Sequence, residues 1–380
     1  MRTIGLLIVL TIGVYVTSPF WEKYADDYID TSFLDKIDQQ VQVGIDYIKE
    51  QPLFTESVET IQTAITELPA QLVEEKNRIL PAPIEPIDKP TLKTPTEGLF
   101  SVHNIEIGAP KDTVVAEIGE PKRITANEYG TSWQTYHTDY QNFFMVSYDR
   151  ENKVNGLFTN NDLIASSLGI KLNSAKEDVR KALGKPLTYI TKGNTNFILN
   201  EDQGADTFLI ENVYATIFYD VHENNTVTAI QILSENLEKS KPSVYAASSK
   251  SLQEGLELQL FDLTNAARVH HGVRAVKWDS LIQITAFDHS EDMAINNYFS
   301  HTNLNGESPF DRMTSDGIFY RVAGENRAYG ESSSIFAHEG LMNSIGHREN
   351  LLKPDFSLLG VGVAFNKENQ PYYTENFYAK

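Results

Sequence analysis

The sequence predicts an α+β protein in which two regions of mixed helices and strands follow a helical N-terminal segment. Residues 98–237 contain an internal repeat that combines short helices with aromatic-rich strands. Helical and strand patterns alternate again over residues 251–380, which favours helices on both faces of a central sheet, an α-β-α sandwich. Residues 22–80 are acidic and carry one apolar stripe at helical spacing, as expected of an amphipathic stalk.

Composition restricts the partners and the chemistry of the chain. Its 380 residues have a formal net charge of −20 and include no cysteine. An acidic chain lacks the basic surface that binds phosphate backbones, so we expect no nucleic-acid partner. Without cysteine there are no disulfides, thiolate metal sites or thiol nucleophiles. Export without disulfides is more typical of a bacterial protein than of a eukaryotic one.

The N-terminus has the features of a targeting segment. An apolar run extends from Ile4 to Val16 and continues through Phe20 and Trp21. Residues 16–19 match a small-residue cleavage site poorly. We therefore predict that residues 1–21 form an uncleaved signal anchor, with a cleaved signal peptide as the alternative. In either case we expect the body to be extracytoplasmic, tethered by a single-pass anchor or secreted after cleavage.

Two linkers separate the predicted regions. Five prolines fall within residues 81–97, and this spacing favours an extended, semi-rigid polyproline segment. Residues 238–250 contain several serine, alanine and lysine residues and form the second linker. We expect this second linker to let residues 251–380 fold by themselves. The apolar stripe of the stalk leaves self-association open as an alternative to a simple spacer.

The internal repeat is visible in two matching segments. Residues 107–121 are echoed by residues 172–186, and each segment predicts a short helix ended by Gly-x-Pro. Glycine there supplies a left-handed helix cap, and the following proline blocks continuation of the helix. The repeats contain no cluster of catalytic residue types, so we interpret this region as a binding or spacing module.

Short motifs follow one another in a characteristic order in the C-terminal region. They are Asn265–Arg268, Val276–Asp279, Ala286–Met293, Tyr298–His301, Gly306–Arg312, Gly324–Asn326, Met342–Arg348, Gly360–Phe365 and Tyr372–Phe377. In this order they resemble the bacterial members of the CAP superfamily (cysteine-rich secretory, antigen 5 and pathogenesis-related proteins). The repeat region resembles the CAP-associated domain that precedes such modules in Bacillus-type proteins. The resemblance implies a CAP/SCP domain with the α-β-α sandwich fold over residues 251–380.

The resemblance also implies a central cleft with two histidines and acidic residues, which binds a divalent metal in some members. By motif match the cleft residues are His301, Glu325 and His347, and Ser344 stands where many eukaryotic members have a second glutamate. Two neutral imidazoles, His301 and His347, suit zinc or a similar divalent cation with an open coordination position. The alternative is structural: a histidine capping helix carbonyls, and Glu325 fixing a turn at Gly324.

Three functions are compatible with these observations. The first is a membrane-tethered extracellular CAP-domain protein that binds a cell-envelope component or a small apolar ligand without catalysis, because its acid set is incomplete. The second is a metal-dependent hydrolase of peptide or cell-wall material, with Glu325 as the candidate base and a histidine-bound ion that activates water. The third is an envelope scaffold whose repeats contact the partners. We also expect Arg348 to hold a helix end against the loop that follows it.

Overall fold

The computed structural model of the chain describes residues 84–199 and 204–380. Within these residues, no helix is both long enough and apolar enough to cross a membrane. The predicted anchor over residues 1–21 and the predicted stalk over residues 22–80 lie outside the described residues. The α+β class predicted from the sequence is confirmed by the elements that follow.

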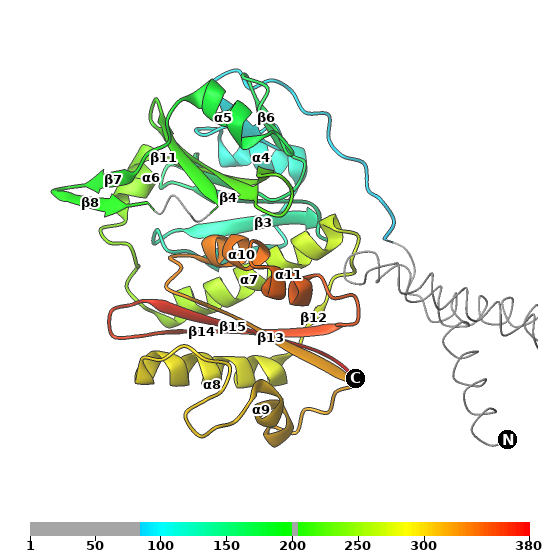
Figure 1. The fold of residues 1–380 in the computed structure, drawn as a ribbon. Helices are drawn as coiled ribbons and strands as arrows, with labels where there is room; N and C mark the ends of the chain where they lie inside the picture. Colours follow the sequence, from blue (N-terminus) through cyan, green and yellow to red (C-terminus); the bar gives the residue numbers. More distant parts are fainter. Residues whose placement is uncertain (1–83, 200–203) are drawn as a thin grey trace, which may run out of the picture. The chain divides into compact units, whose positions relative to one another are not determined.

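The repeat region forms one seven-stranded sheet in the order β2-β3-β4-β5-β11-β10-β9, in which all neighbouring strands are antiparallel (Figure 1). Its strands are β2 (Arg123–Ala126), β3 (Ser132–Thr138), β4 (Gln141–Tyr148), β5 (Val154–Thr159), β9 (Ala205–Ile210), β10 (Val213–Asp220) and β11 (Thr226–Ser234). Strands β5 and β11 pair and so join the two repeats into one sheet.

Each repeat opens with the short helix that the sequence predicts. These helices are α4 (Lys111–Ile118) and α5 (Lys176–Leu183). They end at Gly119 and Gly184, whose φ angles of 91° and 86° are accessible to glycine at little cost. The smaller elements of this region are β1 (Phe100–Val102), β6 (Ile164–Ser166), β7 (Tyr189–Lys192), β8 (Thr195–Ile198) and α6 (Glu235–Ser240).

The C-terminal region is built on a four-stranded sheet in the order β12-β14-β15-β13. Its strands are β12 (Lys277–Trp278), β13 (Val322–Tyr329), β14 (Leu358–Phe365) and β15 (Pro371–Ala379). Its helices are α7 (Lys250–His270), α8 (Ser280–Asn296), α9 (Pro309–Ser315), α10 (Ser334–Met342) and α11 (Ile345–Leu351). Figure 1 shows α7, α10 and α11 on one side of the sheet and α8 and α9 on the other.

The sequence of β14 explains how the sheet is covered on both faces. Side chains alternate along a strand, so Val361 and Val363 point to one face and Gly360 and Gly362 to the other. The valines pack in the core cluster that contains the apolar residues of α7. A Cβ at Gly362 would lie 2.1 Å from the backbone nitrogen of Phe287 in α8. The glycines therefore allow α8 to lie directly on the sheet.

The repeat region and the C-terminal region share a hydrophobic core within the compact unit Ile84–Lys380. The repeat sheet contributes large side chains to this core: Trp133, Phe143, Met145, Phe158 and Phe218. The C-terminal region contributes Leu263, Ala266 and Ile335. The contact is close, because a Cβ on Gly255 of α7 would lie 2.1 Å from the carbonyl oxygen of Ala126 in β2. Segments 98–237 and 251–380 are therefore packed against each other.

Buried ion pairs cross the same interface. The Arg348 guanidinium donates to Asp220 Oδ2 at 2.7 Å, and Arg123 Nε donates to Asp262 Oδ2 at 2.8 Å. Beyond the expected role at its own helix end, Arg348 has a carboxylate partner in β10 of the repeat sheet. The side chains of Arg348 and Asp220 are 11% and 7% exposed, so separating the two regions would leave both charges without their partner.

This interface changes the expectation for residues 251–380 produced alone. Exposing Leu263 and Ile335 should lower the free energy of unfolding by about 3–6 kcal/mol, at about 1.5–3 kcal/mol for each large apolar side chain. We expect the fragment to melt at a lower temperature than residues 84–380 in differential scanning calorimetry. Adding a separately produced fragment of residues 84–250 should recover part of the loss. Equal melting temperatures for the fragment and for residues 84–380 would show that the shared core adds no stability.

Candidate functional site

Glu325 lies at the centre of the candidate site, on the edge strand β13. The residue is 5% exposed, and both of its carboxylate oxygens have donors. His301 Nδ1 donates to Oε1 at 2.8 Å, and Arg312 Nη2 donates to Oε2 at 2.6 Å. The sequence-based placement of Glu325 at a glycine turn is wrong, because Glu325 pairs with Asn376 in the middle of a strand pair. A strand position holds the carboxylate more rigidly than a turn would.

The loop that carries His301 is fixed from both sides. Helix α8 ends at Asn297, which adopts a left-handed conformation with φ 54°. Beyond it, His289 Nε2 donates to the carbonyl oxygen of Ser300 at 2.9 Å, and Arg312 Nη1 donates to that of His301 at 2.8 Å. Burial lowers the pKa of His289, so this imidazole is a neutral framework group.

Helix α11 carries His347 and is held against β13 by asparagine side chains. Asn326 Nδ2 donates to the carbonyl oxygen of His347 at 3.1 Å, and Asn350 Nδ2 donates to Asn326 Oδ1 at 3.1 Å. Gly324 makes this close approach possible, since a Cβ there would lie 2.8 Å from the ring of Phe356. The Gly-Glu-Asn segment therefore positions His347 as well as His301.

His347 is half-buried, and its Nδ1 lies 2.8 Å from the Ser344 hydroxyl oxygen. Burial lowers the pKa of His347, and the charges of His301 and Arg327 lower it further. His347 is therefore neutral at neutral pH. Each histidine makes its protein hydrogen bond through Nδ1 and none through Nε2 among the described residues. The structure thus places the predicted cleft residues His301, Glu325, Ser344 and His347 around one strand.

The arrangement does not fit a metal site with three protein ligands. A carboxylate behind a histidine commonly orients that histidine toward a metal, and Glu325 has this position behind His301. The second oxygen of Glu325, however, accepts a hydrogen bond from Arg312. Glu325 therefore does not act as a third metal ligand beside His301 and His347. Within residues 84–199 and 204–380, no three histidine, aspartate or glutamate side chains gather so that they could hold a metal ion. Zinc binding by His301 and His347 alone stays a prediction.

Residues that the motif analysis did not single out complete the site. Glu325, Arg327 and Tyr329 alternate along β13 and so share one face of the strand. The guanidinium carbon of Arg327 lies 4.3 Å from the ring centroid of Phe299, and Phe299 and Tyr329 are 5.8 Å apart between centroids. Strand alternation after Glu325 was the sequence signal that could have found Arg327.

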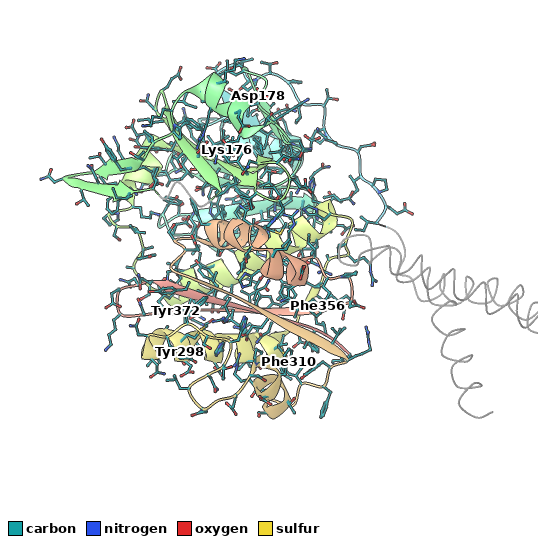
Figure 2. The ribbon with its side chains drawn as sticks, in the orientation of Figure 1. Lys176, Asp178, Tyr298, Phe310, Phe356 and Tyr372 are labelled. Carbon is teal, nitrogen blue, oxygen red and sulfur yellow. The ribbon has the colours of Figure 1, made fainter. Side chains whose placement is uncertain are left out.

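The aromatic side of the site continues into the core. The rings of Tyr329 and Tyr372 are 4.4 Å apart between centroids, on neighbouring strands. Figure 2 shows Tyr372 at the sheet and Tyr298 in the layer of α8 next to it, and both belong to one apolar cluster. Tyr329 is 40% exposed and Phe299 is 47% exposed, so these two rings form the accessible end of the aromatic row.

Comparison with known proteins identifies the family. Residues 261–377 match the cysteine-rich secretory protein (CAP) family, and residues 107–243 match the CAP-associated N-terminal family. The chain is 32% identical over 301 residues to the membrane protein YlbC of Bacillus subtilis, an alignment that covers 74% of this chain and 84% of YlbC. This chain belongs to the CAP family. The resemblance inferred from the motifs is therefore confirmed.

Other CAP proteins match at greater distance. YkwD of Bacillus subtilis is 38% identical over 143 residues, which cover 38% of this chain and 53% of YkwD. The crystal structure of an extracellular protein containing an SCP domain from Bacillus anthracis superposes with a TM-score of 0.63 at 28% identity, covering 77% of this chain and 100% of that one. A cysteine-rich secretory protein from Staphylococcus aureus has a TM-score of 0.56 at 16% identity, covering 72% and 94%, and shows the shared fold.

The position of Glu325 predicts a large effect of its substitution. Glu325→Gln removes the negative charge beside Arg312 and Arg327, whose side chains are 9% and 10% exposed. Loss of one partner from a buried ion pair costs about 3–5 kcal/mol, and we expect a decrease of this size in the free energy of unfolding. Urea denaturation measures it. The exposed Glu291→Gln should change stability by less than about 0.5 kcal/mol, and an equally small effect of Glu325→Gln would contradict the assigned role.

Proposed function

We propose that this CAP-family protein is an extracytoplasmic binding protein whose cleft at His301, Ser344 and His347 holds a component of the cell envelope. The observation that carries the proposal is the pair of histidines whose Nδ1 atoms are both engaged by the protein, at 2.8 Å in each case. Their Nε2 edges are thereby oriented for a ligand. Oriented polar groups next to exposed aromatic rings are typical of binding sites for small groups.

The engagement of Glu325 favours binding over hydrolysis. A general base must reach the proton that it removes, directly or through one water. Both oxygens of Glu325 already accept short hydrogen bonds, from His301 and from Arg312, and its side chain is 1% exposed. A water activated by Glu325 would have to enter this enclosed position beside the two donors. In this role Glu325 is a positioning residue for His301.

An extracytoplasmic location is supported by two kinds of observation. The apolar run from Ile4 to Val16 follows an arginine at the N-terminus, as in a signal anchor. Of the similar proteins, YlbC is described as a membrane protein and the Bacillus anthracis protein as extracellular. We extend both descriptions to this chain as part of the proposal.

Binding to isolated cell-wall sacculi tests the proposed function. The full-length protein in mild detergent should co-sediment with sacculi, and His301→Ala combined with His347→Ala should reduce the bound fraction at least tenfold because both ligand-facing imidazoles are lost. The matched control is His270→Ala with His271→Ala, an exposed pair at the end of α7. Sedimentation that is the same for all three proteins, or absent in the unmodified protein, would contradict the proposal.

Protease treatment of intact protoplasts tests the location. If residues 1–21 anchor an extracytoplasmic body, protease should digest that body while a cytoplasmic marker stays intact. The protein should also remain in the membrane fraction after a high-salt wash. A mature N-terminus at residue 17 or 18 in the culture medium would favour the cleaved alternative, and full protection from protease would contradict an extracytoplasmic location.

A further inference from the structure

Arg327 carries a largely enclosed guanidinium, two of whose nitrogens have no hydrogen-bond acceptor among the described residues. Its side chain is 10% exposed, and Nε and Nη1 are enclosed with no acceptor among the described residues. The nearest carboxylate oxygen, Glu325 Oε1, lies 3.9 Å from Nε, beyond hydrogen-bond distance. On its other side the guanidinium packs against the ring of Phe299. The ring of Phe299 makes a favourable cation–π contact with the face of the guanidinium. It does not accept hydrogen bonds from the N–H groups, which point outward in the plane of the guanidinium.

The charges around Arg327 do not balance. Glu325 is the one carboxylate among the described residues within 4.0 Å of Arg312 or Arg327, and its single charge is shared by both guanidinium groups while its oxygens accept hydrogen bonds from His301 and Arg312. The second guanidinium therefore has no anion of its own. Burial lowers the pKa of Arg327, the charge of Glu325 partly opposes this, and the charge of Arg312 lowers the pKa again, but an arginine stays protonated in proteins. A buried charge that lacks a partner destabilises the folded state.

The cleft offers further groups of matching chemistry beside this guanidinium. His347 is neutral, and when the Ser344 hydroxyl donates to its Nδ1, its Nε2–H is a further hydrogen-bond donor. A guanidinium presents N–H donors in a planar fork that matches a carboxylate or a phosphate, and it repels a divalent cation. The site therefore suits a negatively charged ligand better than a metal ion.

We infer that Arg327 binds an oxyanion, a carboxylate or phosphate group carried by the envelope component that enters the cleft. This inference rests on the proposed function for the statement that the anion comes from the envelope. The chemistry of the anion is inferred from Arg327 itself. The exposed ring of Phe299 packs against the guanidinium and lies 5.8 Å from the exposed ring of Tyr329 between centroids, and both rings offer apolar faces to the uncharged part of the ligand. Arg327 is thus a specificity residue that selects acidic ligands.

Anion titration of the full-length protein in detergent tests the inference. Inorganic phosphate and acetate are titrated by calorimetry, and the melting temperature is recorded with and without each anion. We expect saturable binding of at least one of them, weakened at least tenfold in Arg327→Gln and less in Arg327→Lys, which keeps the charge but loses the fork. Arg274→Gln, at an exposed arginine, should bind as the unmodified protein does.

Arg327→Met separates a ligand-binding role from a structural one. Methionine can pack against Phe299 without a charge, so this variant should melt at a higher temperature than the unmodified protein in anion-free buffer. It should also lose the anion-dependent rise in melting temperature. A lower melting temperature of Arg327→Met in anion-free buffer, or equal anion binding in Arg327→Gln and unmodified protein, would overturn the inference. Absence of phosphate and acetate binding to the unmodified protein would overturn it as well.

Sacculi separate this inference from the proposed function and also identify the anion. Binding to sacculi that needs His301 and His347 but not Arg327 would support the envelope function and overturn the oxyanion inference. Phosphate or acetate binding that needs Arg327, without any binding to sacculi, would support the oxyanion site and overturn the envelope as its source. Loss of binding after the phosphate-bearing polymers are stripped from the sacculi supports a phosphate ligand, and retained binding supports a carboxylate.

Discussion

The buried carboxylate of Glu325 is the interaction on which the cleft depends. It receives His301 from the loop after α8 and Arg312 from α9, and it lies on β13, whose neighbouring residues hold α11. A single acid thus ties together three segments that are distant in sequence. Removing its charge would weaken the contacts of the loop and of α9, which bind the carboxylate directly through His301 and Arg312, whereas α11 is held by Asn326 and by the backbone carbonyl oxygen of Glu325.

The same carboxylate also limits what the cleft can do. Its two oxygens accept hydrogen bonds from His301 and Arg312, and Nε and Nη1 of Arg327 beside it have no acceptor among the described residues. One carboxylate thus faces two guanidinium groups. This excess of positive charge supports the proposed binding of an acidic group.

The packing between the repeat region and the CAP domain places this cleft on a larger scaffold. Helix α7 contacts the repeat sheet through Gly255 and the CAP sheet through its apolar residues, so it is shared by both cores. Arg348, in the same short helix as His347, pairs with Asp220 of the repeat sheet. The position of one cleft histidine therefore depends on contacts made by both regions.

The sequence predicts the class of fold well, because the fold class depends on local patterns. The Gly-x-Pro helix ends and the alternation of Val361, Gly362 and Val363 are examples, since a few consecutive residues determine them. The motifs also select His301, Ser344 and His347, whose role in binding stays a prediction. The partner of Arg348 lies 128 residues away, and no local pattern indicates a contact at that separation. The surroundings of Arg327 depend on its contact with Phe299 and on the hydrogen bonds of Glu325 to His301 and Arg312. These contacts are known only from the three-dimensional structure.

A high-resolution crystal structure of the full-length protein, grown without and then with phosphate, would show whether Arg327 is an oxyanion site. We expect a guanidinium of Arg327 that packs against Phe299 with no protein acceptor, Glu325 bound to His301 and Arg312, and phosphate oxygens within hydrogen-bond distance of Arg327 when phosphate is present. A guanidinium that turns to solvent, or that donates to a protein carbonyl in both crystals, would contradict this expectation.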